Sequence, residues 1–325
     1  MPTHISSRPI SRLTAAPFAA LLLALVACTS QAQVPTRAPE FTGISQWLNS
    51  KPLTMQDLRG KVVLIDFWAY SCINCLRTLP HVTAWYDRYK DKGLVVVGVH
   101  APEFEFEKST ANVRKAIEKY GIHYPVAQDN DMATWRAWNN RFWPAEYLVD
   151  RDGKVVMHHY GEGHYEATEN AIRGLLGMEP MTGEVKDKDF SGVGSPEMYL
   201  GLARAQNQAN PHALPRLTHT YKLPGSLALN RYALQGQWKL SDEYARQMGP
   251  KGAIRLRFRA ARVNMVAASD KPVQLAITVD GKPQPPVTVH DSRLYTLYQA
   301  SKPGEHVIEI RTSRAGLKAF TFTFG

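Results

Sequence analysis

The sequence predicts an α/β domain followed by an all-β antiparallel sandwich, and three observations lead to this prediction. Apolar runs typical of buried strands alternate with amphipathic helical segments up to about residue 178. Beyond about residue 215 the apolar period becomes two, as in Ile254, Leu256 and Phe258. The first 33 of the 325 residues have the composition of a targeting segment.

These changes of pattern divide the chain into four segments. Their expected bounds are residues 1–33 for a signal with the start of a tether, 34–178 for the α/β domain, 179–215 for a linker and 216–325 for the sandwich. The linker is rich in Gly, Pro, Asp and Ser and has one short helical patch near residues 196–206. Residues 34–42 are expected to be an extended tether.

Within the α/β domain, strands and helices are expected to alternate and to build a central mixed sheet flanked by helices. The expected strands are 61–67, 94–100, 124–127, 145–149 and 154–159. The expected helices are 72–90, 109–120, 131–138 and 165–176. The sequence Asp-Arg-Asp-Gly at 150–153 predicts a hairpin turn between the last two strands.

The sandwich is expected to consist of short strands separated by turns. Its expected strands are 254–259, 273–279, 287–289, 294–298, 306–310 and 319–324. Four aromatic residues of this region, Trp238, Tyr244, Tyr295 and Tyr298, have the chemistry to stack on a sugar. Packing in the core or between strands is the alternative, and it is the one that we favour.

The first 33 residues have the features of a cleaved signal. Arg8 and Arg12 precede an apolar run over residues 13–27, which is short for a membrane span. The run ends in Leu-Val-Ala-Cys, which resembles a bacterial lipobox, so we expect lipidation at Cys28. Cleavage after Ala32 without lipidation and an uncleaved anchor helix are the alternatives. The mature protein is therefore expected in the periplasm, either anchored to a membrane through Cys28 or soluble.

The other two cysteines, Cys72 and Cys75, indicate redox chemistry. A disulfide-stapled scaffold would need more cysteines that close longer loops. Half of a structural zinc site is the alternative, but the sequence has no second Cys-x-x-Cys. The three histidines between residues 158 and 164 suit an exposed strand end better than a metal site. We therefore expect no metal and no cofactor.

The net charge of +10 is spread along the chain without a dense basic run. Such a distribution is typical of a solvated surface and allows weak attraction to anionic partners. Because the chain has no clustered basic motif and is expected to be exported, we do not expect it to bind nucleic acid.

Cys72-Ile-Asn-Cys75 directly follows a predicted buried strand and opens a predicted helix. The first cysteine is expected to face free backbone N–H groups and the positive end of the helix dipole, which stabilise a thiolate. The second cysteine lies one turn later on the same face and can attack the first sulfur to resolve a mixed disulfide. We therefore expect Cys72 to be the nucleophile and Cys75 the resolving thiol.

Three further positions fit this chemistry. Asp66, near the end of the preceding strand, is expected to exchange protons with Cys75, with a solvated carboxylate as the alternative. Pro80 is expected to kink the helix. Trp143 and Pro144 precede a strand, and we expect a cis peptide between them that faces the dithiol and offers backbone groups to an incoming peptide.

These motifs resemble the thioredoxin superfamily. Within it, the chain is most similar to the TlpA/redoxin branch and to the periplasmic C-terminal part of DipZ-type proteins. The strings that carry the resemblance are Tyr-Ser-Cys-Ile-Asn-Cys-Leu-Arg at 70–77, Gly-Val-His-Ala-Pro-Glu-Phe at 98–104, Trp-Pro-Ala-Glu-Tyr-Leu at 143–148 and Gly-Glu-Gly at 161–163. The resemblance covers about residues 40–325, and it implies a thioredoxin fold followed by a sandwich similar to a carbohydrate-binding module.

The resemblance also implies site residues and partners. It assigns Trp68, Tyr70, Trp143 and Pro144 to the substrate-binding surface around the redox-active pair. Family members can carry an acidic residue near the dithiol, but Glu103 lies in an acidic loop and is expected to be solvated. DipZ-type proteins begin with a membrane-embedded electron-transfer domain, whereas this chain begins with a signal. The expected electron donor is therefore a separate membrane protein of the DsbD/CcdA type.

The expected function is disulfide exchange with exported proteins. The reducing direction is favoured because Ile73-Asn74 lacks the His of strongly oxidising members, and cytochrome c maturation is one route that the family suggests. A redoxin-type thiol peroxidase is an alternative, but its Pro-x-x-x-Thr-x-x-Cys motif has Ile65 and Ala69 at the Pro and Thr positions. Another alternative is a binding protein whose sandwich holds a glycan or protein ligand beside an accessory redox domain.

Overall fold

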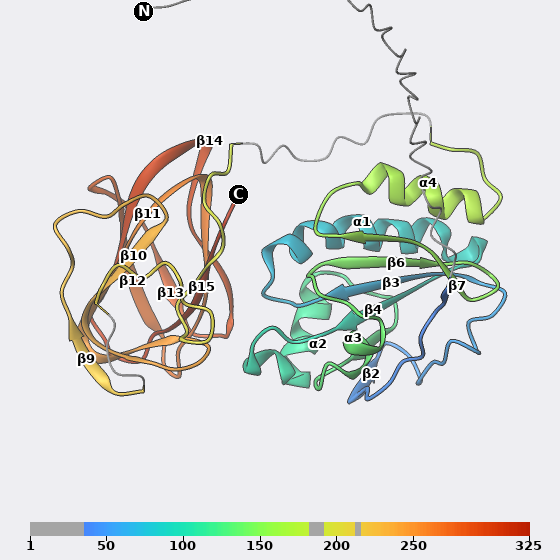
Figure 1. The fold of residues 1–325 in the computed structure, drawn as a ribbon, viewed down its shortest axis with the longest axis horizontal. Coiled ribbons are helices and arrows are strands. Elements are labelled where there is room, and N and C mark those ends of the chain that lie inside the picture. The colour runs from blue at the N-terminus through green and yellow to red at the C-terminus, as the bar shows by residue number, and fades with distance from the viewer. Residues whose placement is uncertain (1–35, 182–191, 212–215) are drawn as a thin grey trace, which may run out of the picture. The chain divides into compact units, whose positions relative to one another are not determined.

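A mixed sheet flanked by helices forms the first part of the chain (Figure 1). The computed structural model describes residues 36–181, 192–211 and 216–325. The strands of this sheet lie in the spatial order β1-β7-β6-β3-β4-β5-β2. Their bounds are Thr36–Arg37 for β1, Gln46–Leu48 for β2, Val62–Trp68 for β3, Leu94–His100 for β4, Val126–Gln128 for β5, Ala145–Val149 for β6 and Lys154–Tyr160 for β7.

The centre of the sheet is parallel and its flanks are antiparallel. Strand β4 pairs parallel with both β3 and β5. Strand β6 pairs antiparallel with β3 on one side and with β7 on the other. All seven residues of β3 are buried, as expected of a strand covered on both faces. This burial places any polar side chain of β3 away from water.

Helices cover both faces of the sheet. Their bounds are Ile73–Tyr89 for α1, Thr110–Lys119 for α2, Ala133–Ala137 for α3 and Tyr165–Leu175 for α4, with 3-10 turns at Lys90–Lys92 (η1) and Glu105–Lys108 (η2). Apolar residues of α1, α2 and α4 pack on one face in a single core cluster, and Figure 1 shows α1 and α4 on the same side of the strands. Helix α3 and the segment 38–58 contribute to a second cluster on the opposite face.

The predicted order of elements is confirmed, and β4 and β6 have the predicted bounds. The tether prediction for residues 34–42 is wrong in part, because Thr36 and Arg37 pair with Val155 and Lys154 of β7 as an edge strand. Strand β2 was not predicted. Both strands are held by backbone pairing, and two or three residues are too few to show an apolar period.

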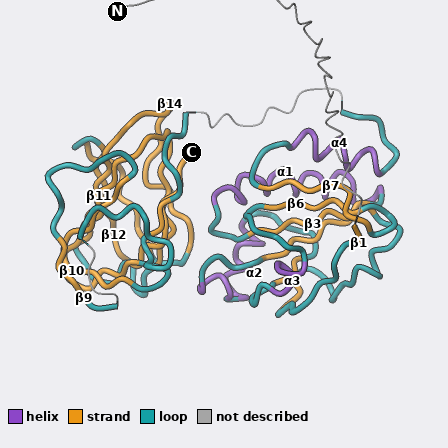
Figure 2. The backbone as a smooth tube through the Cα atoms, viewed as in Figure 1, coloured by secondary structure: helices purple, strands orange, loops and turns teal. Residues whose placement is uncertain are grey.

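The second sheet is antiparallel throughout, and Figure 2 shows no helix in the described part of it. Its strands are Met198–Tyr199 (β8), Thr218–Tyr221 (β9), Arg231–Leu240 (β10), Ala245–Ala268 (β11), Val273–Val279 (β12), Lys282–Val289 (β13), Arg293–Thr312 (β14) and Lys318–Phe324 (β15). The fold class is therefore as predicted, an α/β thioredoxin fold followed by an all-β antiparallel domain.

Strand β14 joins two strands that the sequence predicted as separate. The strand continues across the predicted break, because Gly304 pairs with Ala260 and Gln299 pairs with Arg262 of β11 on the two sides of a register shift. The helical patch expected near residues 196–206 is wrong as well. Met198 and Tyr199 pair with β15, so their backbone hydrogen bonds are satisfied by a sheet.

The aromatic candidates for sugar stacking are accounted for mainly by packing. Trp238 and Tyr295 are buried in the core of the second sheet. Tyr298 packs against that core with its ring 6.3 Å from Phe258, and Tyr244 lies 5.1 Å from Phe320 between ring centroids. The alternative of core and strand packing therefore fits these residues.

Apolar contacts connect the two sheets in the described part of the chain. Phe104 packs in a small cluster with Val266, Ala268 and Phe320, and its ring lies 5.1 Å from that of Phe320. The domain boundary between about 179 and 215 stays a prediction. In the described residues, no helix is long and apolar enough to cross a membrane.

Candidate active site

The two cysteines lie at the start of α1. Cys72 is the N-cap of the helix, with φ −74° and ψ 116°, and its Sγ accepts a hydrogen bond of 3.3 Å from the backbone N–H of Cys75. Both residues are free thiols. Cys72 is partly exposed, whereas Cys75 is 1% exposed. The geometry thus presents one sulfur to a partner and keeps the second behind it.

Burial dominates the acidity of both thiols. It raises the pKa of Cys72 even though the hydrogen bond from Cys75 lowers it, and the charges of Glu103 and Glu197 raise it further. The pKa of Cys75 is raised well above its ordinary value, first by burial and then by Cys72, with a smaller contribution from Asp66. The thiolate stabilisation expected at the helix N-terminus is therefore outweighed by desolvation in this dithiol state.

Asp66 lies in the middle of the buried sheet, 1% exposed, and the alternative of a solvated carboxylate is wrong. Neither of its carboxylate oxygens has a hydrogen-bond partner among the described residues. Burial raises its pKa to about 7, so the carboxyl titrates near neutral pH. Such a group can accept and release a proton under ordinary conditions.

The loop before the dithiol is held by a buried glutamate that the sequence did not single out. Oε1 of Glu107 accepts hydrogen bonds from the backbone N–H of Ser71 at 3.0 Å and from its hydroxyl at 2.8 Å. Oε2 accepts from the backbone N–H of Glu103 at 2.7 Å. Glu107 is fully buried, and burial raises its pKa to about 7. It joins the loop before Cys72 to turn η2.

Glu103 itself is not solvated, contrary to expectation. Its side chain is 8% exposed and forms an ion pair of 2.8 Å with Arg204. It also accepts a hydrogen bond of 2.9 Å from the hydroxyl of Tyr199. Residues after the α/β domain therefore supply its partners, which local sequence could not reveal.

The peptide between Trp143 and Pro144 is cis, as predicted. Pro144 is buried, and Trp143 is partly buried with its indole N–H donating to the backbone oxygen of Ala101 at 2.9 Å. Trp143 and Cys72 both border the core cluster on the α1 face. Pro80 lies within α1 as expected.

Trp68 is a correction to the predicted substrate-binding surface. It is fully buried and meets the ring of His100 edge-on at 5.0 Å, so it offers no surface to a substrate. It packs instead in the core cluster on the α1 face of the sheet. His100 is also fully buried, and burial lowers its pKa to about 3, so it is neutral.

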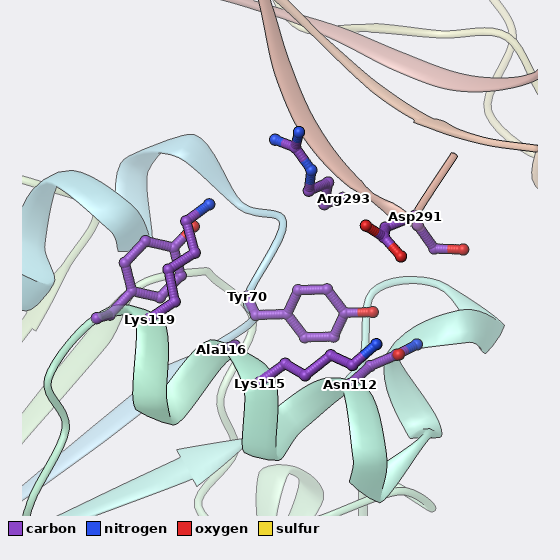
Figure 3. Close-up of a pocket in the computed structure, with 9 residues that line it drawn as sticks. Tyr70, Asn112, Lys115, Ala116, Lys119, Asp291 and Arg293 are labelled. Atoms are coloured by element: carbon purple, nitrogen blue, oxygen red, sulfur yellow. The ribbon is translucent and has the colours of Figure 1, made fainter. Parts of the chain in front are cut away.

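Tyr70 forms part of the wall of a pocket of about 360 Å³ (Figure 3). Its ring stacks on His100 at 5.7 Å. Figure 3 shows Lys115 and Asn112 of α2 beside this ring, with Asp291 and Arg293 across the pocket. The pocket thus places a residue two positions before Cys72 among several polar and charged groups.

The signal predictions fall on residues 1–33, including Cys28, and these lie outside the described residues. In the part of the chain that the structure describes, no group of three or more His, Cys, Asp or Glu side chains is arranged to hold a metal ion.

Glu146 is a second buried acid that sequence reasoning missed. It lies on β6, directly opposite Asp66, and is 3% exposed. A signal was present in the sequence, because a glutamate interrupts the otherwise uncharged strand Ala145–Val149.

Two family models match the chain. The thioredoxin-like C-terminal domain family matches residues 195–325, and the AhpC/TSA family matches residues 34–158. Protein DipZ of Mycobacterium tuberculosis is 40% identical over 305 residues, which cover 89% of this chain and 43% of DipZ. Thiol-disulfide oxidoreductase YkuV of Bacillus subtilis is 34% identical over 138 residues, which cover 42% of this chain and 93% of YkuV.

A thioredoxin-like protein whose solution structure is of the oxidized form is 31% identical to the chain. It covers 45% of this chain and 97% of its own, with a TM-score of 0.42. The chain belongs to the thioredoxin-like family that includes YkuV. It spans less than half of the length of the DipZ relatives that it matches.

Proposed function

We propose that this protein is an exported thiol–disulfide oxidoreductase that reduces disulfides of exported proteins through Cys72 and Cys75. The single observation that carries the proposal is the placement of the two thiols. Cys72 is partly exposed at the N-cap of α1, and Cys75 is buried one turn later with its backbone N–H on the sulfur of Cys72. This is the arrangement of an attacking and a resolving thiol.

The reaction transfers two electrons from the dithiol to the substrate. The Cys72 thiolate attacks a substrate disulfide, so a bond forms between Cys72 and one substrate sulfur, and the other substrate sulfur leaves with the electron pair and takes a proton from water. Cys75 then gives up its proton and attacks the Cys72 sulfur. The protein disulfide forms, the second substrate thiol leaves, and Asp66 is the proposed acceptor of the Cys75 proton.

Substrate and donor follow from the same chemistry. The cis Pro144 and the neighbouring Trp143 and Tyr70 are the proposed substrate-binding residues. The proposed electron donor is a membrane protein of the DsbD/CcdA type, with cytochrome c maturation as one route. The proposal includes export with lipidation at Cys28. It also includes a glycan or a protein as the ligand of the second domain.

Mixed-disulfide trapping tests the proposal. The mature protein should reduce insulin in the presence of dithiothreitol, and Cys72→Ser should abolish this activity. Cys75→Ser should instead accumulate mixed disulfides through Cys72, because no resolving thiol remains. Non-reducing electrophoresis and mass spectrometry read the adducts. If Cys72→Ser forms the adducts and Cys75→Ser does not, the two roles are reversed.

A further inference from the structure

A second buried carboxyl faces Asp66 across the sheet. Asp66 of β3 and Glu146 of β6 are directly opposite in the antiparallel register. Residues directly opposite on such strands point to the same face of the sheet, with Cβ atoms about 4.5–5.5 Å apart. Asp66 lies between Leu64 and Trp68 in the alternation of β3, which places both acids on the face that α1 and Cys75 cover.

No Lys or Arg side chain of the described residues forms an ion pair with either acid. Asp66 is 1% exposed and Glu146 is 3% exposed. Among the described residues, the only hydrogen bond to either carboxyl comes from the hydroxyl of Thr168 in α4, which donates to Oε2 of Glu146 at 3.2 Å. Both oxygens of Asp66 and Oε1 of Glu146 lack a partner in the described part of the chain.

The neighbouring strand β4 has no cationic side chain opposite Asp66. Gly98 is opposite Asp66 on β4, and a Cβ atom there would lie 3.0 Å from Tyr124 and 3.1 Å from the indole nitrogen of Trp68. These two rings therefore occupy the space where a longer side chain would reach Asp66. Two adjacent buried carboxylates without a cation strongly disfavour double ionisation.

We propose that Asp66 and Glu146 act as one proton-sharing pair, in which Glu146 holds the proton that Asp66 passes to Cys75 when the protein disulfide is reduced. This inference rests on the proposed role of Cys75. Glu146 acts through Asp66 and is a positioning residue in this account. The titrating behaviour agrees with the geometry, because burial raises the pKa of Asp66 to about 7, and burial together with the charge of Asp66 raises that of Glu146 to about 8.

The need for a proton arises when a donor thiolate attacks Cys72. A bond forms between the donor sulfur and Cys72, the Cys72–Cys75 bond breaks, and the electron pair goes to Cys75. A buried thiolate at Cys75 is costly, since burial raises the pKa of this thiol well above its ordinary value. The carboxyl of Asp66 donates a proton to it, and Glu146 restores that proton to Asp66. A second donor thiol then releases Cys72 as its own disulfide forms.

Other groups face the pair and belong to its titration. The hydroxyl of Tyr124 is buried beside both acids, and its pKa is raised well above the ordinary value, so it stays protonated. Burial raises the pKa of Tyr165 in α4, and the charge of Glu146 makes a smaller contribution. On β7, His159 is opposite Glu146 and half-buried, with its ring stacked on that of His164 at 4.7 Å.

The test compares rates of reduction of the oxidised protein by dithiothreitol between pH 6 and 9.5. Samples are quenched with acid, and free thiols are alkylated and counted by mass spectrometry. Because the same dithiothreitol attacks each protein, its own ionisation cancels in the ratio of variant to wild type. The wild-type pair loses its last proton near pH 8, whereas Glu146→Gln leaves Asp66 to lose it near pH 7.

The ratio of Glu146→Gln to wild type should therefore fall about tenfold between pH 6.5 and pH 9, since one pKa unit is a factor of ten. The matched control is Glu169→Gln, a buried glutamate of α4 that is paired with Arg88, and its ratio should not vary with pH. A Glu146→Gln ratio that is constant across pH, whether near one or uniformly low, would overturn the proposal and leave Glu146 a structural residue.

A second readout does not depend on rates. In protein labelled with carbon-13 at glutamate side-chain carboxyls, one resonance that is lost in Glu146→Gln should titrate near pH 8 and move to lower pH in Asp66→Asn. A titration midpoint near 4.5 that is the same in the wild type and in Asp66→Asn would contradict the proposed proton sharing. If the oxidised wild type does not react with dithiothreitol at Cys72, the proposed function fails; if it reacts and the pH profiles coincide, only the pair fails.

Discussion

Each of the two sheets of this molecule has a pair of ionisable residues directly opposite each other on antiparallel strands. Asp66 and Glu146 are directly opposite on β3 and β6, and Arg255 and Glu309 are directly opposite on β11 and β14. In the second sheet the opposite charges form an ion pair of 2.7 Å that is partly open to solvent. In the first sheet both partners are acids, and both are buried.

The two pairs differ in whether they stabilise the pairing of their strands. Opposite charges across two strands stabilise their pairing, whereas like charges directly opposite destabilise it. The pair on β11 and β14 therefore supports the fold at little cost. The pair on β3 and β6 opposes the fold whenever both acids are ionised, and it lies on the same face as Cys75, the proposed resolving thiol. We attribute its presence to proton transfer, not to stability.

The largest expected effect concerns stability at alkaline pH. The pKa values of Asp66 and Glu146 are raised in the folded state above their values in an unfolded chain. The folded state therefore binds more protons between about pH 4 and 8, and the free energy of unfolding falls as pH rises through this range. Above about pH 8 the loss is complete, and below about pH 4 it is absent.

The double variant Asp66→Asn/Glu146→Gln removes both titrations. At pH 9 it should be more stable than the wild type by up to about 9 kcal/mol, because each of the two pKa values is raised by about three units or more and each unit corresponds to about 1.4 kcal/mol. At pH 5, where both acids are protonated in the folded state, most of this gain should vanish. Urea unfolding at the two pH values measures the difference in stability. An equal gain at pH 5 and pH 9 would show that the fold does not penalise ionisation of the two acids.

A smaller effect is expected at the opposite-charge pair. Arg255→Gln removes the cation that faces Glu309, but Arg311 also contacts this glutamate. The loss of stability should be about 0.5–1 kcal/mol at pH 7, because the pair is partly exposed. It should shrink in high salt, since salt screens exposed charges. If Arg255→Gln lowered the free energy of unfolding by as much as the double variant raises it, the two charge pairs would not differ in the way described.

The order of elements around the dithiol could be predicted because each element carries its own signal. Strands β4 and β6 are mainly apolar runs, with Glu146 as the one charged residue of β6, and α2 begins at the cap Ser109. Strands β1, β2 and β8 could not be predicted, since their existence depends on a distant partner strand. The length of β14 depends in the same way on its pairing with β11.

The candidate site was predicted where chemistry follows from spacing along the chain. The dithiol, its position at a helix start and the cis peptide at Pro144 are of this kind. Glu107 and Glu146 were missed, and Glu103 was misjudged, because their roles depend on burial. Burial of an acid is decided by strands and side chains that are remote in sequence, such as Arg204 beside Glu103 and β3 beside Glu146.

The reduction potential of the Cys72–Cys75 couple tests the central claim most directly. It is measured by equilibrating the protein with dithiothreitol or glutathione buffers and counting the free thiols at each ratio. A reductant of exported proteins should have a potential near that of thioredoxin, about −270 mV. A potential near that of DsbA, about −120 mV, would mark the protein as an oxidant and contradict the account.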